Sequence, residues 1–126
     1  MGELAVLRHE EGVRLDAARL MALYDDLGET AAETVMCRAM EELSARVAEM
    51  QRQFRCGESD AFGRNARSIG RVAAQVGMSS LARVAQDVAD CAALGETVAL
   101  AATWARLERL GYRSLVAVWD LQDMSV

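Results

Sequence analysis

Three features of the sequence predict an all-α fold. The chain contains no proline, so long helices can run without interruption. Apolar residues make up 52% of the chain and recur every three or four positions, with no strand-like alternation. Glycines fall where these apolar stretches end, which is typical of helix C-termini. For 126 residues we expect one domain, an antiparallel up-down four-helix bundle over 15–121, preceded by an N-terminal extension with a short helix over 1–14.

The N-terminal part predicts two helices. The first is weak and runs from Leu4 to Glu10, ending near Gly12. The second begins after Asp16, whose carboxylate is the expected N-cap, and ends at Gly28. One face of this second helix is apolar: Leu20, Leu23, Tyr24 and Leu27.

The longest predicted helix opens with the capping box Thr30-Ala31-Ala32-Glu33 and ends at Gly57. Its apolar residues follow a heptad spacing that indicates a buried seam. The seam consists of Met36, Met40, Leu43, Val47, Met50 and Phe54, and the opposite, solvated face carries Arg38, Glu41, Glu42, Arg46, Glu49 and Arg52.

Three more helices follow. Ser59 or Asp60 is the predicted cap of the first, which runs to about Val76 and ends at Gly77. Its expected core stripe is Phe62, Ala66, Ile69, Ala73 and Val76. The next is expected to begin at a Ser79 cap, to face inward through Leu81, Val84, Ala85, Val88 and Cys91 or Ala92, and to close at Gly95. The last runs from Glu96 or Thr97 to about Leu121, with the stripe Leu100, Trp104, Leu107, Leu115 and Val118 interrupted at Gly111.

Composition excludes several functional classes. All 14 basic residues are arginine and the net charge is −5, so bulk electrostatic binding to nucleic acid is not expected. Without lysine, Schiff-base chemistry has no amine. The cysteines Cys37, Cys56 and Cys91 have no metal-ligand or redox spacing and are interpreted as reduced, partly buried thiols. No signal pattern or membrane-length apolar run occurs, so we expect a cytoplasmic protein.

The sequence also gives no grounds for an enzyme, a cofactor or a metal site. A carboxylate-bridged metal centre in a bundle needs inward-facing Glu-x-x-His pairs. The single histidine, His9, has no glutamate three residues before it. We therefore interpret His9 as a surface residue.

One helix carries a distinctive pattern of charge. Arg64, Arg67 and Arg71 are spaced so that they share one face, beside the predicted core stripe. Such a positive strip in an acidic protein favours a carboxylate or phosphate cluster on a partner. The alternative is an ordinary solvated face, paired with Glu49 and neighbouring acids. Gly63 and Gly70 lie inside the same helix, which indicates either tolerated drift or the close approach of another backbone.

From about Leu15 to Leu121 the chain resembles the histidine-containing phosphotransfer (Hpt) domain of bacterial two-component phosphorelays. The resemblance rests on turn glycines at matching separations and on the small and apolar residues between them. The matching segments are 57–62 at the turn and helix start, Ala66, Ile69, Ala73, Val76 and Gly77 in the core and at its end, 81–88 in the next helix, and 92–96 in the last turn.

The active centre departs from the family pattern. Where the family has its phosphorylated histidine, then a lysine and a glycine, this chain has Arg67, Gly70 and Arg71. Arginine offers no lone pair for attack on phosphorus. Asn65, two residues away, is expected to point elsewhere and is no phosphoacceptor of this type.

The resemblance therefore implies a degenerate Hpt-like adaptor that does not carry phosphate. Its expected partner is a response-regulator receiver domain or a histidine kinase. The predicted partner-binding residues are Arg64, Arg67, Ser68, Gly70, Arg71 and Gln75.

Two other functions stay open. One is a structural or oligomerising module, for example a homodimer formed through an apolar patch of Val116, Trp119 and Leu121 or of Leu4, Val6 and Leu7. The other is a working phosphotransferase that uses His9, next to the cation of Arg8.

Overall fold

The computed structural model describes residues 14–124, including their side chains except at residue 115 and residues 117–124. Every regular element in this range is a helix, which confirms the all-α prediction. The helices are α2 (Ala17–Leu27), α3 (Glu29–Cys56), α4 (Ser59–Gln75), α5 (Ser79–Leu94) and α6 (Thr97–Met124). The predicted first helix, Leu4 to Glu10, and with it His9, lies outside the described residues.

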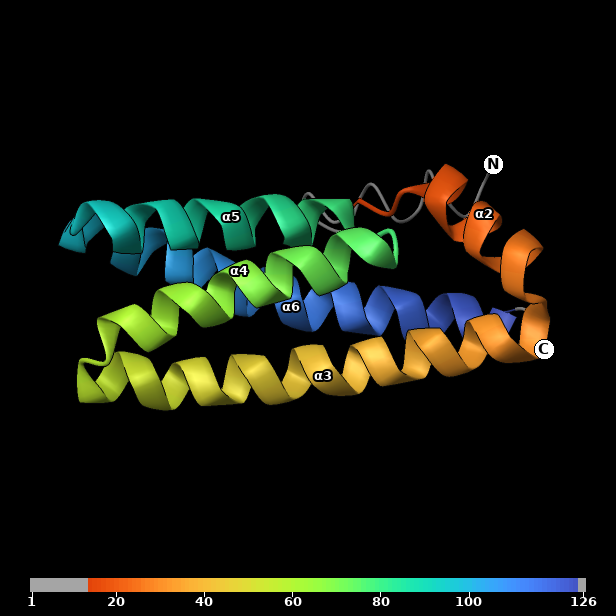
Figure 1. Cartoon of the computed structure of the whole chain (residues 1–126), viewed down its shortest axis with the longest axis horizontal. Coiled ribbons are helices and arrows are strands. Elements are labelled where there is room, and N and C mark those ends of the chain that lie inside the picture. Colours follow the sequence, from red (N-terminus) through yellow and green to blue (C-terminus); the bar gives the residue numbers. More distant parts are fainter. Residues whose placement is uncertain (1–13, 125–126) are drawn as a thin grey trace.

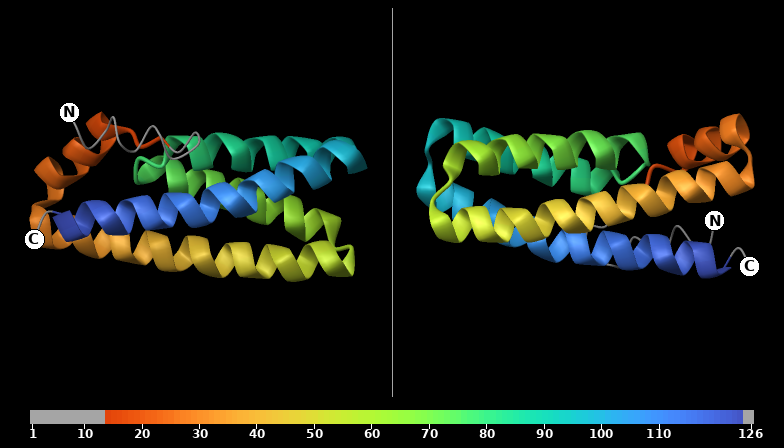
Figure 2. Two further views of the ribbon diagram at one scale, coloured as in Figure 1. Left: turned by 180° about the vertical axis from the view of Figure 1, so that it is seen from behind. Right: turned by 60° about the horizontal axis from the view of Figure 1, so that its bottom comes forward.

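The four helices α3 to α6 lie side by side, and each runs in the opposite direction to the one before it (Figure 1). The main contacts of α4 are with α3 and α5, and α6 contacts both α5 and α3. Seen from behind, α6 lies between α5 and α3 (Figure 2). The shorter α2 lies at a steep angle at one end and contacts α3 (Figure 1).

Glycines with a positive φ end α3, α4 and α5, as the sequence predicts. Gly57, Gly77 and Gly95 have φ values of 71°, 79° and 69°, a left-handed conformation that disfavours residues with a Cβ. The residue after each glycine donates its backbone N–H to a carbonyl five residues earlier: Glu58 to Gln53 at 3.0 Å, Met78 to Ala73 at 2.8 Å and Glu96 to Cys91 at 3.3 Å. These Schellman motifs satisfy carbonyls at the helix ends and reverse the chain within two or three residues.

The predicted cap of α2 is confirmed, whereas the predicted capping box of α3 is wrong. Asp16 Oδ1 accepts a hydrogen bond from the backbone N–H of Arg19 at 3.0 Å. In contrast, α3 begins at Glu29 directly after Gly28, so Thr30 already lies inside its first turn. The carbonyl of Thr30 accepts a bond from the Thr34 hydroxyl at 3.0 Å. Gly28 is the N-cap of α3, so the helix begins at Glu29, one residue before Thr30.

The predicted side-chain caps of α4 and α5 are also wrong. Ser59 and Ser79 are the first helical residues, and the N-cap positions are Glu58 and Met78, with no capping bond from their side chains. The reason is the shortness of the turns. In both turns the residue that follows the Schellman glycine is already the N-cap, so the serine after it is the first residue of the helix. Asp60, the other predicted cap, is the second residue of α4.

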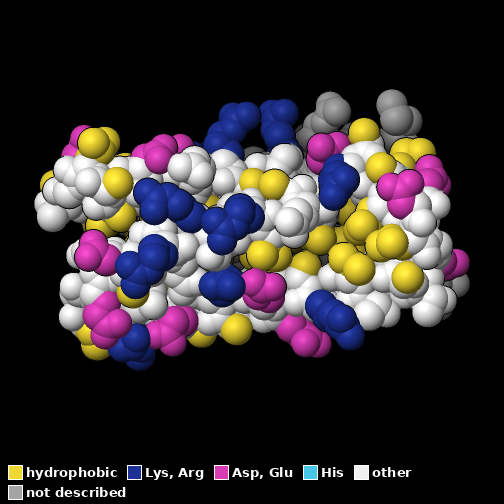
Figure 3. Space-filling model, in the orientation of Figure 1, with side chains coloured by type: hydrophobic (Ala, Val, Ile, Leu, Met, Phe, Trp, Pro, Cys, Tyr) yellow, Lys and Arg dark blue, Asp and Glu magenta, His cyan; other side chains and the backbone are white. Residues whose placement is uncertain are grey.

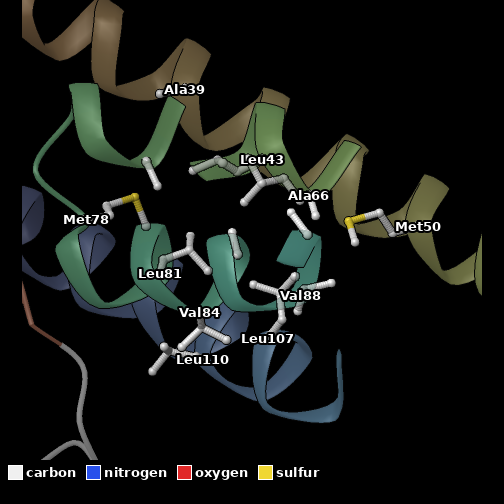
Figure 4. Packing of buried hydrophobic residues seen from close by; sticks show 14 of the residues in the cluster. Ala39, Leu43, Met50, Ala66, Met78, Leu81, Val84, Val88, Leu107 and Leu110 are labelled. Carbon is white, nitrogen blue, oxygen red and sulfur yellow. The ribbon is translucent and has the colours of Figure 1, made fainter. Parts of the chain in front are cut away.

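The core fills the space between α3, α4, α5 and α6. All five predicted residues of the α4 stripe are buried, which confirms that stripe. Figure 4 shows side chains of the four helices pointing into one interior: Ala39, Leu43 and Met50 of α3, Ala66 of α4, Leu81, Val84 and Val88 of α5, and Leu107 and Leu110 of α6. Most of the core is therefore aliphatic.

Three aromatic rings close one end of this core. Phe62 packs against Trp104 with ring centroids 5.1 Å apart, and Phe54 lies 5.6 Å from Phe62 and 6.1 Å from Trp104. Phe54 is nevertheless 41% exposed, so the predicted α3 seam becomes solvent-accessible at its last residue. Leu27, predicted for the apolar face of α2, is exposed as well.

Helix α6 continues through Gly111, so the predicted interruption does not break the helix. Gly111 is buried, and a Cβ at this position would lie 3.9 Å from Leu81 and 4.0 Å from Val47. The glycine thus lets α6 pass close to α5 and α3. Leu100 is half-buried, Trp104 and Leu107 are buried, and the predicted stripe residues Leu115 and Val118 fall among the side chains that are not described.

Candidate functional site

The arginine strip, formed by Arg64, Arg67 and Arg71, lies on the solvent face of α4. All three side chains are exposed, whereas Ala66 and Ile69 between them are buried. Figure 3 shows basic side chains gathered over the face that α4 presents in this view. The amphipathic period of α4 therefore fixes the strip opposite the core.

The strip makes no ion pair within the described part of the chain. Its one hydrogen bond runs from Arg71 Nη2 to Ser68 Oγ at 3.2 Å. Glu49, the acid proposed as a partner in the solvated-face interpretation, accepts a bond from Arg52 Nε at 2.6 Å instead. The guanidinium donors of the strip are thus directed to solvent.

An open hollow of about 230 Å³ lies beside the strip, between α4 and α5. Arg64 and Arg67 line it together with Gly63, and Ser59 and Asp60 line it at the start of α4. The α5 side contributes only small residues, Ala89, Ala92 and Ala93. A partner side chain can approach the two guanidinium groups here without meeting a bulky neighbour.

The two glycines inside α4 face α5. A Cβ on Gly63 would lie 3.4 Å from Ala92 Cβ, and one on Gly70 would lie 3.6 Å from the Ala82 carbonyl oxygen. Both glycines thus lie where α4 and α5 approach closely. Gly70, one of the predicted partner-binding residues, is half-buried at this contact rather than on the strip.

Of the other predicted partner-binding residues, Ser68 is half-buried next to the strip and Gln75 is exposed at the last turn of α4. The Gln75 carbonyl accepts a bond from Arg19 Nε of α2 at 2.9 Å. Close by, the backbone N–H of Asp16 donates to the Gly77 carbonyl at 2.6 Å. The segment that begins α2 therefore borders the end of the surface on which Gln75 lies.

Sequence reasoning missed a polar link that fixes α4 on α3. Asn65, only 8% exposed, accepts a bond from Arg46 Nη1 at 3.0 Å. Its own Nδ2 donates to the Arg46 carbonyl at 3.2 Å and to Gln53 Oε1 at 3.5 Å. The signal was present in the sequence: Asn65 lies four residues before Ile69 of the core, so it had to face a neighbouring helix.

The turn before α4 is held by charge. Both carboxylate oxygens of Glu58 accept bonds from Arg52, at 2.8 and 3.0 Å, and this hydrogen bonding lowers the pKa of Glu58 below its ordinary value. The same contacts, with Glu49, raise the pKa of Arg52 further. The start of α4 is thereby tied to the last turns of α3.

The chemistry of the site is that of recognition. A guanidinium stays protonated and donates in a planar fork, which suits a carboxylate or a phosphate, but it cannot act as a nucleophile. In the part of the chain described here, no three His, Cys, Asp or Glu side chains gather in a way that could hold a metal ion. The three cysteines are free thiols, and Cys56 is exposed, contrary to expectation.

Comparisons with known proteins add no family. No family model, no curated protein and no solved structure matches the chain. None of the helices in the described range is both long and apolar enough to span a membrane.

Proposed function

We propose that this chain is a degenerate Hpt-like domain, an antiparallel up-down four-helix bundle of α3 to α6 that binds a receiver domain or a histidine kinase and transfers no phosphate. The order of the helices, their alternating direction and their short glycine turns support the bundle assignment. In the Hpt family the phosphorylated side chain lies on the helix that corresponds to α4. The proposal places the protein in the cytoplasm, where such partners act.

The observation that carries the proposal is the unpaired arginine strip. Arg67 stands at the phosphoacceptor position of the resemblance, is exposed, and its guanidinium group makes no hydrogen bond or ion pair with a described residue. It borders the hollow between α4 and α5. An exposed cation beside an open hollow is free to enter a complementary site on a partner.

The receiver is the preferred partner because of charge. Receivers of two-component systems present an acidic phosphorylation pocket, and an arginine fork pairs well with carboxylates. Arg67 would occupy that pocket as a cation where a phosphohistidine would otherwise lie. Since no group is transferred, the bound protein acts as a competitor or sequestering factor.

The test is a binding screen against the receiver domains of the source genome. We expect at least one receiver to bind, and Arg67→Glu to weaken that complex by about tenfold or more, because it puts a carboxylate into an acidic pocket. Arg109→Glu is the matched control: it changes the charge equally at an exposed position on α6. If no receiver binds the wild type, or if both variants lose binding equally, the proposal fails.

A structural or oligomerising module is the second candidate, favoured by one observation on α6. Tyr112 and Val116, one turn apart, are 72% and 40% exposed. Of the patch predicted from the sequence, Val116 is exposed, while the side chains of Trp119 and Leu121 and the segment with Leu4, Val6 and Leu7 lie outside the description. Light scattering distinguishes the candidates: a dimer that Val116→Asp dissociates, without any receiver binding, supports this alternative.

A further inference from the structure

A second hollow, separate from the arginine strip, gathers three other arginines. It has a volume of about 400 Å³ and lies at the start of α5. Its lining comes from three parts of the chain: Arg14 before α2, the α5 residues Ser79, Ser80, Arg83 and Val84, and Arg106 of α6. We name it the arginine hollow.

The backbone holds Arg14 in place at this hollow. Its carbonyl accepts a bond from Ser79 Oγ at 3.2 Å and from the backbone N–H of Ser80 at 3.4 Å. Two residues further on, the Asp16 N–H donates to the Gly77 carbonyl. The backbone of Arg14 is therefore attached to the first residues of α5, although Arg14 precedes them by more than 60 residues in sequence.

Within residues 14–124, no acidic side chain compensates the charge of the hollow. No described Asp or Glu lines it, and the first turn of α5 contains no acidic residue. Arg14, Arg83 and Arg106 form no hydrogen bond through their guanidinium groups, and no ion pair, with any described residue. Elsewhere, Arg46 and Arg52 are paired with acids on α3 or in the turn after it. Three like charges around one hollow repel one another unless an anion lies between them.

We propose that the arginine hollow binds a small phosphate-bearing molecule through a diphosphate group. Three guanidinium forks match an anion of two or more charges better than a single carboxylate. The Ser80 hydroxyl, which makes no hydrogen bond to another described residue, adds a donor. The volume of about 400 Å³ falls in the range of about 300–1,000 Å³ typical of small-molecule sites. This inference does not depend on the proposed receiver binding.

The test is calorimetric titration of the full chain with pyrophosphate at fixed ionic strength, with sulfate as the comparison anion. We expect pyrophosphate to bind about tenfold or more tightly than sulfate, since it spans more than one guanidinium. Arg83→Glu and Arg106→Glu should each weaken pyrophosphate binding by about tenfold or more. Arg106→Lys, which keeps the charge and loses the fork, should give an intermediate loss.

Two control variants separate the site from general electrostatics. Arg38→Glu and Arg55→Glu make the same charge change at exposed positions on α3, which contributes no residue to the lining of the hollow, and should leave pyrophosphate binding within about twofold of wild type. Circular dichroism verifies that each variant folds, and Arg106→Lys carries the test if a glutamate variant does not. The proposal is overturned if pyrophosphate binds no more tightly than sulfate, or if the control variants lose as much affinity as the hollow variants.

Discussion

Arginines on α3 and on α4 both reach solvent, but they differ in what surrounds them. On α3, Arg46 pairs with Glu42 at 2.8 Å and Arg52 pairs with Glu49 and Glu58. On α4, the arginine strip has no acid at a spacing of three or four residues other than Asp60, which precedes Arg64 by four and forms no ion pair with it. Acids of α3 and of the turn after it thus occupy Arg46 and Arg52, whereas the guanidinium groups of the strip form no ion pair with a described residue and stay available to a partner.

The largest expected effect on stability comes from breaking the hydrogen bonds between Asn65 of α4 and Arg46 of α3. Asn65→Ala removes the acceptor of Arg46 Nη1 and the donor to the Arg46 carbonyl. Because these groups are partly buried, we expect a loss of about 1–3 kcal/mol in the free energy of unfolding. Urea denaturation measures it. Ser68→Ala, next to the strip, is the control and should stay within about 0.5 kcal/mol; an equally small change in Asn65→Ala would show that the link does not hold α4.

A smaller effect on stability is expected from a substitution at Gly70, which tests whether Gly70 belongs to the partner surface. Gly70→Ala should raise the free energy of unfolding by about 0.5–1 kcal/mol, because the helix gains an alanine and the new Cβ meets α5 only at ordinary contact distances. Receiver binding should be unchanged, since Gly70 faces α5. Gly77→Ala is the counterpart and should destabilise: φ is +79° and its Cβ would lie 3.0 Å from the Asp16 carbonyl oxygen. Thermal unfolding gives both values, and weaker receiver binding by Gly70→Ala would return Gly70 to the partner surface.

The smallest effect is expected from a substitution that gives α4 an acid at the spacing found on α3. Ser68→Glu places an acid three residues before Arg71, the spacing of Glu49 and Arg52. We expect a gain of about 0.2–0.5 kcal/mol in helix stability and a weaker receiver complex, because the new carboxylate competes for the strip. Thermal unfolding and the receiver-binding assay measure the two changes. Ser68→Gln is the neutral control; equal receiver binding by both variants would show that Arg71 is not part of the interface.

Much of the fold was predictable because its signals are local. The α4 stripe from Phe62 to Val76 is buried as its spacing indicates, and the glycines at 57, 77 and 95 end their helices. The absence of side-chain caps from Ser59 and Ser79 was not predictable from residue type. The Schellman turns are too short to leave a separate capping residue, so backbone geometry overrides the preference of the side chain.

The candidate site was likewise predictable only where its signals are local. The exposure of Arg64, Arg67 and Arg71 follows from helical period alone, and the structure agrees. The role of Asn65 depends on Arg46, 19 residues earlier, and the arginine hollow depends on residues from three separate parts of the chain. Such groupings require the tertiary arrangement, which a pattern along one helix does not contain.

The turns have a consequence for how the chain reaches its native state. Among the main helix contacts, α3 with α4, α4 with α5, and α5 with α6 all join neighbours in sequence, and α3 with α6 spans the longest separation. Chains dominated by local contacts fold quickly, since little loop-closure entropy is lost before each contact forms. We therefore expect adjacent hairpins to form early and α6 to dock on α3 in a late step.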